Sequence, residues 1–115
     1  MTALLFAAQR LTAFVLAAAV AIHLGTIVYA VRGGLTAAEI LARTHGNVGF
    51  ALFYATFVVA VAIHAPIGLR NVLREWTPWQ GRSLDIALAL FSMLLLIIGF
   101  RAAVAVYLPP EAMFG

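Results

Sequence analysis

Cysteine and lysine are both missing from this sequence of 115 residues. Without cysteine the chain forms no disulfide and offers no thiolate to zinc or to an iron–sulfur cluster, so a redox centre of its own must use histidine. Acidic residues are also scarce, with four Asp and Glu against seven arginines. Because the arginines gather at the ends of apolar runs, they indicate membrane topology, and we expect no nucleic acid as a partner.

Apolar residues, by contrast, make up 65% of the chain, and the mean hydropathy is +1.09. A soluble domain needs more polar surface than this, so lipid must surround most of the chain. Three apolar runs of about 20 residues are each long enough to cross roughly 30 Å of hydrocarbon. We therefore expect an all-α membrane protein with three transmembrane helices in up-down-up order, in a single membrane-anchor domain over residues 1–115.

The predicted membrane spans cover residues 11–31, 47–69 and 84–108. Residues 1–10 form a mostly apolar lead, which we expect to lie at the interface or to extend the first helix. The first apolar run is longer than the core of a signal peptide, so we expect it to be retained.

The connections between the spans carry their own signals. Thr36 followed three residues later by Glu39 is a capping box, which predicts a short interfacial helix between the first and second spans. Residues 70–82 mix arginine with tryptophan, as in a loop at the level of the lipid headgroups. Pro109 and Pro110 are expected to close the last helix.

The distribution of arginines predicts an orientation. Four arginines lie on the N-terminal side of the membrane, namely Arg10, Arg70, Arg74 and Arg82. Arg32 and Arg43 lie on the opposite side. By the positive-inside rule the N-terminus lies in the cytoplasm, and we expect a multi-pass protein of the inner (cytoplasmic) membrane.

Histidines inside apolar spans are the natural candidates for chemistry, since ionisable groups are costly in a bilayer. Phe50, Phe53 and Phe57 follow helical spacing and form an aromatic stripe on the helix face that leads to His64. A neutral imidazole on such a helix can be an axial ligand of haem iron. The alternative is a histidine that is only hydrogen-bonded to a neighbouring helix.

Two further residues shape the surroundings of His64. Pro66 removes the hydrogen bond to the carbonyl of Ala62, so we expect a kink and a carbonyl that needs another donor. Gly68 lies one turn beyond His64 and permits a close approach, either by the edge of a porphyrin or by another helix.

His23 is the second-choice haem ligand because it lies at a different depth. At about 1.5 Å per residue, His23 lies about 18 Å from the N-terminal side of the membrane and His64 about 7 Å. A mismatch of about 10 Å is awkward for two ligands on one iron. The better partner for His64 is therefore a histidine of a second anchor chain, identical or related.

Arg10, where the first span begins, and Arg70, where the second ends, lie on the same side of the membrane. Together with Trp76 they could contact a quinone head or haem propionates, since guanidinium groups bind carboxylate and carbonyl oxygens. Ordinary topology anchoring also explains these residues.

The order of these residues resembles the cytochrome b membrane-anchor subunits of succinate dehydrogenase and fumarate reductase. In the segment 63–76, His64 is followed four residues later by Gly68 and then by a basic and aromatic exit, as in the haem-ligand helix of those anchors. The run Gln9-Arg10-Leu11-Thr12-Ala13 resembles the start of their first helix, where an arginine followed by serine or threonine borders the quinone site. The resemblance covers nearly the whole chain.

The resemblance implies that His64 is an axial ligand of haem b and that Arg10 contacts quinone or propionate. Glu75 and Trp76 stand where many anchors have aspartate and tyrosine near the quinone, and Phe6 stands where serine is frequent, so these positions depart from the family. The implied partners are an iron–sulfur subunit, a flavoprotein subunit, a second anchor chain and membrane lipid, and the implied cofactors are haem b and ubiquinone or menaquinone. The chain would carry electrons without performing the dehydrogenation.

Two alternatives remain. One is a haem-free membrane anchor of another flavin and iron–sulfur dehydrogenase, in which the histidines only pack. The other is a small transporter subunit, which would be expected to show an acidic residue or a broken helix at the midplane of the bilayer, and neither is visible in the sequence.

Overall fold

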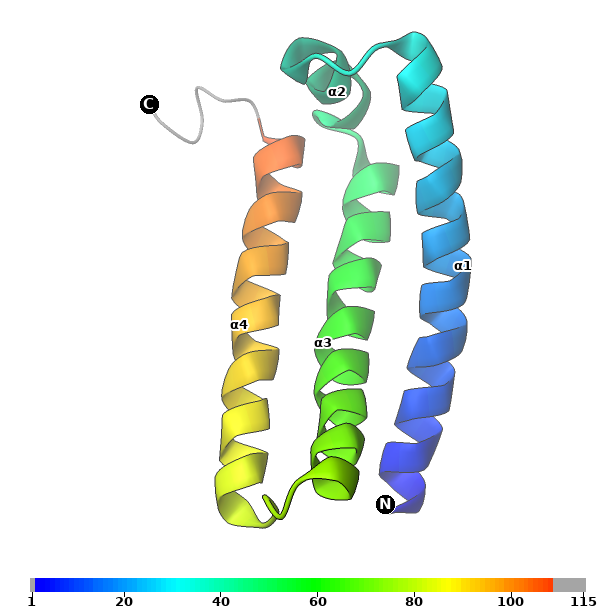
Figure 1. The fold of residues 1–115 in the computed structure, drawn as a ribbon. Coiled ribbons are helices and arrows are strands. Elements are labelled where there is room, and N and C mark those ends of the chain that lie inside the picture. Colours follow the sequence, from blue (N-terminus) through cyan, green and yellow to red (C-terminus); the bar gives the residue numbers. More distant parts are fainter. Residues whose placement is uncertain (1, 109–115) are drawn as a thin grey trace.

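The computed structural model describes residues 2–108, which form four helices and no strand. The helices are α1 (Ala3–Gly33), α2 (Ala37–Thr44), α3 (Val48–Trp76) and α4 (Arg82–Tyr107). Figure 1 shows that α1, α3 and α4 run up, down and up, while the short α2 lies across one end. Each of the three long helices is long and apolar enough to cross a membrane. The expected all-α, multi-pass membrane architecture is therefore confirmed.

The bundle has two ends that differ in what they contain. We call the end with the N-terminus and the α3–α4 connection the N-terminal end, and the opposite end the α2 end (Figure 1). The few buried apolar side chains are small or lie on α4, namely Ala19, Ala60, Ala62, Leu84 and Leu88. Large side chains such as Phe14 and Leu52 face outward. Small residues between helices and large ones facing lipid are the usual arrangement of a membrane bundle.

The long helices extend beyond the predicted membrane spans. α1 begins at Ala3, because the hydroxyl of Thr2 caps it by accepting from the N–H of Leu5 at 3.2 Å, so the apolar lead continues the first helix. α3 continues to Trp76, and the expectation of a loop beginning at Arg70 is wrong for residues 70–76. The predicted closing prolines Pro109 and Pro110 lie outside the described residues.

The predicted cap of α2 is present, with one difference. The hydroxyl of Thr36 accepts from the N–H of Glu39 at 3.2 Å, and the carboxylate of Glu39 accepts from that same hydroxyl at 2.7 Å. In a full capping box the carboxylate would accept from the backbone N–H of Thr36. Gly34 makes the preceding turn with φ of 112°, and a Cβ there would overlap the carboxylate of Glu39. Only glycine fits this turn.

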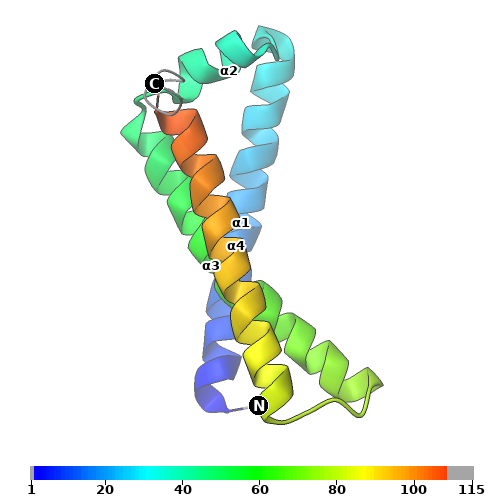
Figure 2. The same cartoon turned by 90° about the vertical axis from the view of Figure 1, so that its left-hand side faces the viewer.

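Pro66 has the effect on α3 that its chemistry predicts. Proline has no N–H, so the carbonyl of Ala62 loses its helical donor. The hydroxyl of Ser92 on α4 donates to that carbonyl at 2.7 Å. Figure 2 shows that the last turns of α3 swing away from the other helices. The carbonyl freed by Pro66 is thus used to join α3 to α4.

Candidate functional site

A polar contact joins α1 to α3 in the N-terminal half of the bundle. The hydroxyl of Thr12, which is buried, lies 3.3 Å from Nδ1 of His64. The same hydroxyl lies 2.7 Å from the carbonyl oxygen of Ala8 and 3.1 Å from that of Gln9, both on its own helix. His64 itself is partly exposed. One edge of its imidazole is therefore engaged by α1, and the ring remains reachable from outside the chain.

Gln9 extends this contact by one helical turn toward the N-terminus. An ideal Cβ on Gly68 would lie 3.2 Å from Nε2 of Gln9, so the space above Gly68 is used by α1. Gly68 was expected to permit a close approach by either a porphyrin edge or another helix, and the structure has a side chain of another helix there. The side-chain oxygen Oε1 of Gln9 is buried and has no hydrogen-bond partner. A buried carbonyl without a donor is costly and points to a missing donor beside it.

His23 has different surroundings. Its ring lies 6.3 Å from that of Tyr54 in an edge-on arrangement and 6.1 Å from that of Phe57. Tyr54 also contacts the rings of Phe50 and Phe53. The aromatic stripe of α3, which the sequence places on the face leading to His64, therefore packs against His23 of α1 at the α2 end.

The two histidines lie at different depths. Thr12 contacts His64, and His23 follows Thr12 by three turns of the same helix, so it lies about 16 Å further along the axis at about 1.5 Å per residue. This separation is larger than the 10 Å mismatch expected from the spans. The two imidazoles of one chain cannot ligate a single iron.

The two predicted arginines have different partners. The guanidinium carbon of Arg10 lies 5.6 Å from the centre of the Phe6 ring, so Phe6 supports the arginine as a cation–π partner. Nε of Arg70 donates to Oδ1 of Asp85 at 3.0 Å, with the Arg70 side chain 25% exposed and that of Asp85 57% exposed. The sequence interpretation missed Asp85. Its position in the first turn of the helix that follows α3 was the available signal.

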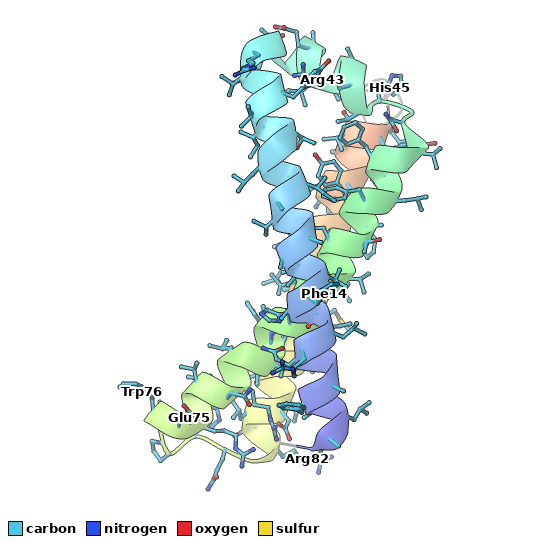
Figure 3. All side chains as sticks on the ribbon, turned by 90° about the vertical axis from the view of Figure 1, so that its right-hand side faces the viewer. Phe14, Arg43, His45, Glu75, Trp76 and Arg82 are labelled. Carbon is cyan, nitrogen blue, oxygen red and sulfur yellow. The ribbon has the colours of Figure 1, made fainter. Side chains whose placement is uncertain are left out.

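Trp76 stands apart from these arginines. It lies at the tip of α3, is 82% exposed, and in Figure 3 points away from the bundle beside Glu75. The other tryptophan, Trp79, uses its indole N–H to donate to the hydroxyl of Ser83 at 2.9 Å. Within residues 2–108, no hydrogen bond or ion pair links Arg10, Arg70 and Trp76 to one another. They share one end of the bundle but form no single preassembled site.

A cavity of about 640 Å³ lies at the α2 end, bounded by α1, α2 and the first turns of α3. Its lining is mainly apolar, with polar groups from His23, Arg43, Asn47 and Tyr54 among the lining residues. The guanidinium of Arg43 donates to the carbonyl of Gly34 at 2.5 Å and lies 5.9 Å from the ring of Tyr29. Arg43, one of the residues that line this cavity, is thus held by the α1–α2 turn.

Among the described residues, no three side chains of His, Cys, Asp and Glu converge as a metal-binding group. Haem iron needs no such group, because the porphyrin supplies the other nitrogen ligands and the protein only the axial ones. Comparisons of this chain with protein-family models, with curated proteins and with solved structures found no match.

Proposed function

We propose that this chain is a membrane-anchor subunit of a succinate dehydrogenase- or fumarate reductase-like complex and helps to bind haem b and quinone. The observation that carries the proposal is the contact between Thr12 and His64. It holds the imidazole of a partly exposed membrane histidine by one nitrogen, while the rest of the ring remains available to a ligand from outside the chain.

The residues around His64 fit a haem. A metal-ligating histidine almost always uses its second ring nitrogen in a hydrogen bond, which is the arrangement found at Nδ1 of His64. When bound, the haem would supply a one-electron centre close to the quinone.

A second protein ligand to the haem would come from another chain in this proposal. His23 lies about 16 Å from the level of Thr12 and His64, which is too far to complete the same haem. A second anchor subunit, identical to this one or related to it, would present its own histidine at the depth of His64. The outward-facing apolar surfaces of the three helices leave room for such a neighbour and for lipid.

We place the quinone at the N-terminal end because the chain offers several donors there. Arg70 uses Nε on Asp85, and its terminal nitrogens remain as donors to a quinone carbonyl or a haem propionate. Arg10 and the indole N–H of Trp76 are exposed at the same end. We place this end in the cytoplasm of a cell whose inner membrane holds the complex, so that an iron–sulfur subunit and a flavoprotein subunit dock on the arginine-rich face.

A haem-free anchor of another flavin and iron–sulfur dehydrogenase is the second candidate. The observation in its favour is the same Thr12–His64 contact, because an interhelical hydrogen bond already satisfies one nitrogen of the histidine. In that case His64 would serve helix packing alone.

A reduced-minus-oxidised optical spectrum of the detergent-purified complex tests the proposal. We expect a b-type haem signal in the wild type, its loss in His64→Ala and its retention in His23→Ala. His23→Ala is the matched control, because it removes the other membrane histidine from the same bundle. An intact purified complex without haem would make the haem-free anchor the better description.

A further inference from the structure

We propose that Thr12 is a positioning residue that fixes the tautomer and orientation of His64, so that Nε2 presents its lone pair to the haem iron. The inference deepens the proposed function and rests on it. It follows from the number of hydrogens available to the Thr12 hydroxyl and its three neighbours, namely the carbonyl oxygens of Ala8 and Gln9 and Nδ1 of His64.

A threonine hydroxyl has a single hydrogen to donate and two lone pairs with which to accept. The carbonyl oxygens of Ala8 and Gln9, at 2.7 Å and 3.1 Å from the hydroxyl of Thr12, can only accept. The shorter of these contacts takes the hydrogen, as is usual for a threonine that bonds back to its own helix. The lone pairs of the hydroxyl then face Nδ1 of His64 at 3.3 Å, and the hydrogen between them must come from the ring.

This assignment decides the state of the imidazole. A neutral imidazole carries one hydrogen, so a ring that donates from Nδ1 has its free lone pair on Nε2. The nitrogen that binds metal is set by the hydrogen bond that the other nitrogen makes. The Thr12 hydroxyl also donates to Ala8, and this donation polarises the hydroxyl and makes it a better acceptor for the ring N–H.

Removing the hydroxyl of Thr12 should therefore change the properties of His64 as an iron ligand, as well as the stability of the fold. A hydrogen bond at the second nitrogen raises the basicity of the ligating nitrogen, which favours ferric over ferrous iron. Its loss should raise the midpoint potential of the haem. Loss of such partners typically weakens metal binding by about tenfold or more.

The chain provides matched variants for this test. Thr12→Val keeps the shape of the side chain and deletes the hydroxyl, and Thr12→Ser restores it. Thr56 on α3 bonds back to the carbonyl of Leu52 at 2.8 Å without facing an imidazole. Thr56→Val thus removes the same kind of local bond and leaves His64 alone.

The first measurement is the ¹⁵N NMR spectrum of the full chain in micelles without haem, labelled at histidine, with His64 assigned from its absence in His64→Gln. We expect the Nδ1–H tautomer in the wild type, Thr12→Ser and Thr56→Val, and loss of that preference in Thr12→Val. An Nε2–H tautomer in the wild type, or an unchanged tautomer in Thr12→Val, would overturn the inference.

The second measurement is a potentiometric titration of haem in the purified complex. We expect Thr12→Val to raise the midpoint potential and to weaken haem binding about tenfold, with Thr12→Ser near the wild type and Thr56→Val unchanged. Equal potentials in Thr12→Val and Thr56→Val would also overturn the inference. If the wild-type complex holds no haem, the proposed function fails, and the tautomer measurement still decides whether Thr12 sets the state of His64.

Discussion

The two membrane histidines look alike in the sequence, since each is a lone imidazole in an apolar run, yet the bundle treats them differently. His64, in the N-terminal half, has a hydroxyl from the next helix on one ring nitrogen. His23, toward the α2 end, has aromatic rings around it, and among residues 2–108 its ring nitrogens have no hydrogen-bond partner. The surroundings of each histidine therefore depend on the helix that packs against it. The apolar run that contains the histidine does not reveal them.

The distance between α1 and α3 also differs between the surroundings of the two histidines. Near His64, Gln9 of α1 fills the space above Gly68, so α1 and α3 are in close contact. Toward the α2 end, Figure 2 shows α1 diverging from α3 and α4, with α2 bridging the gap. The cavity of about 640 Å³ lies in this gap. In the half around His64, α1 and α3 are thus in close contact, whereas in the other half the two helices meet through the rings of His23, Tyr54 and Phe57 and are joined by a turn and a short helix.

The largest effect is expected from breaking the turn at the α2 end. Gly34→Ala should lower the free energy of unfolding by about 2–3 kcal/mol, because it combines a glycine-only backbone conformation with displacement of the Glu39 carboxylate. Gly46→Ala is the matched control. Gly46 has φ of 69° with open space at its Cβ position, so it should lose only about 1 kcal/mol.

The unfolding of both glycine variants can be followed by far-UV circular dichroism in mixed micelles with increasing dodecyl sulfate. The ¹⁵N signal of His64 should stay unchanged in Gly34→Ala if the two halves are held independently. Equal losses for the two glycines, or a changed His64 signal, would contradict this division of the bundle.

A smaller effect is expected from the α3–α4 bond beside His64. Ser92→Ala leaves the carbonyl of Ala62 without a donor and should cost about 1 kcal/mol, within the range of hydrogen bonds between membrane helices. In a Pro66→Ala background, the N–H of residue 66 can reach that carbonyl, and the same substitution should cost almost nothing. A double-mutant cycle measured in the mixed micelles checks this, and additive losses would show that Ser92 does not compensate for Pro66.

The smallest effect is expected from His23→Phe. An aromatic replacement keeps ring contacts with Tyr54 and Phe57, so the free energy of unfolding should change by less than about 0.5 kcal/mol. His64→Phe is the matched substitution at the other site, and it should cost more because it removes the partner of the Thr12 hydroxyl. Unfolding in the same micelles compares the two, and a larger loss at His23 would reverse the contrast between the histidines.

The fold could be predicted from the sequence because it depends on signals within single segments. The lengths of the apolar runs predict three spans, and Thr36 with Glu39 predicts the short helix between the first two. The end of α3 was placed too early because arginine and tryptophan at a membrane surface occur in helices as well as in loops. Pro78 carried the better signal, since a helix usually ends before the residue that precedes a proline.

The surroundings of the candidate site could be predicted only in part. The freed carbonyl of Ala62 follows from Pro66 alone, but the donor Ser92 depends on how α4 lies against α3. The partners Thr12 for His64 and Asp85 for Arg70 likewise depend on the relative shift of two helices along the membrane normal. A single sequence does not contain this shift, because each helix can slide by a turn without changing its own apolar pattern.

The Ser92 bond also bears on water inside the membrane. A carbonyl freed by proline in the middle of a bilayer would draw water to itself unless a protein donor replaced the missing N–H. Ser92 supplies that donor to the carbonyl of Ala62, which lies two residues before His64 in α3. The bundle can therefore stay dry at this depth. Hydrogen bonds are electrostatically stronger in a dry, low-dielectric region than in water. A serine on α4 whose hydroxyl bonds to a backbone carbonyl thus helps to keep the surroundings in which Thr12 and His64 interact.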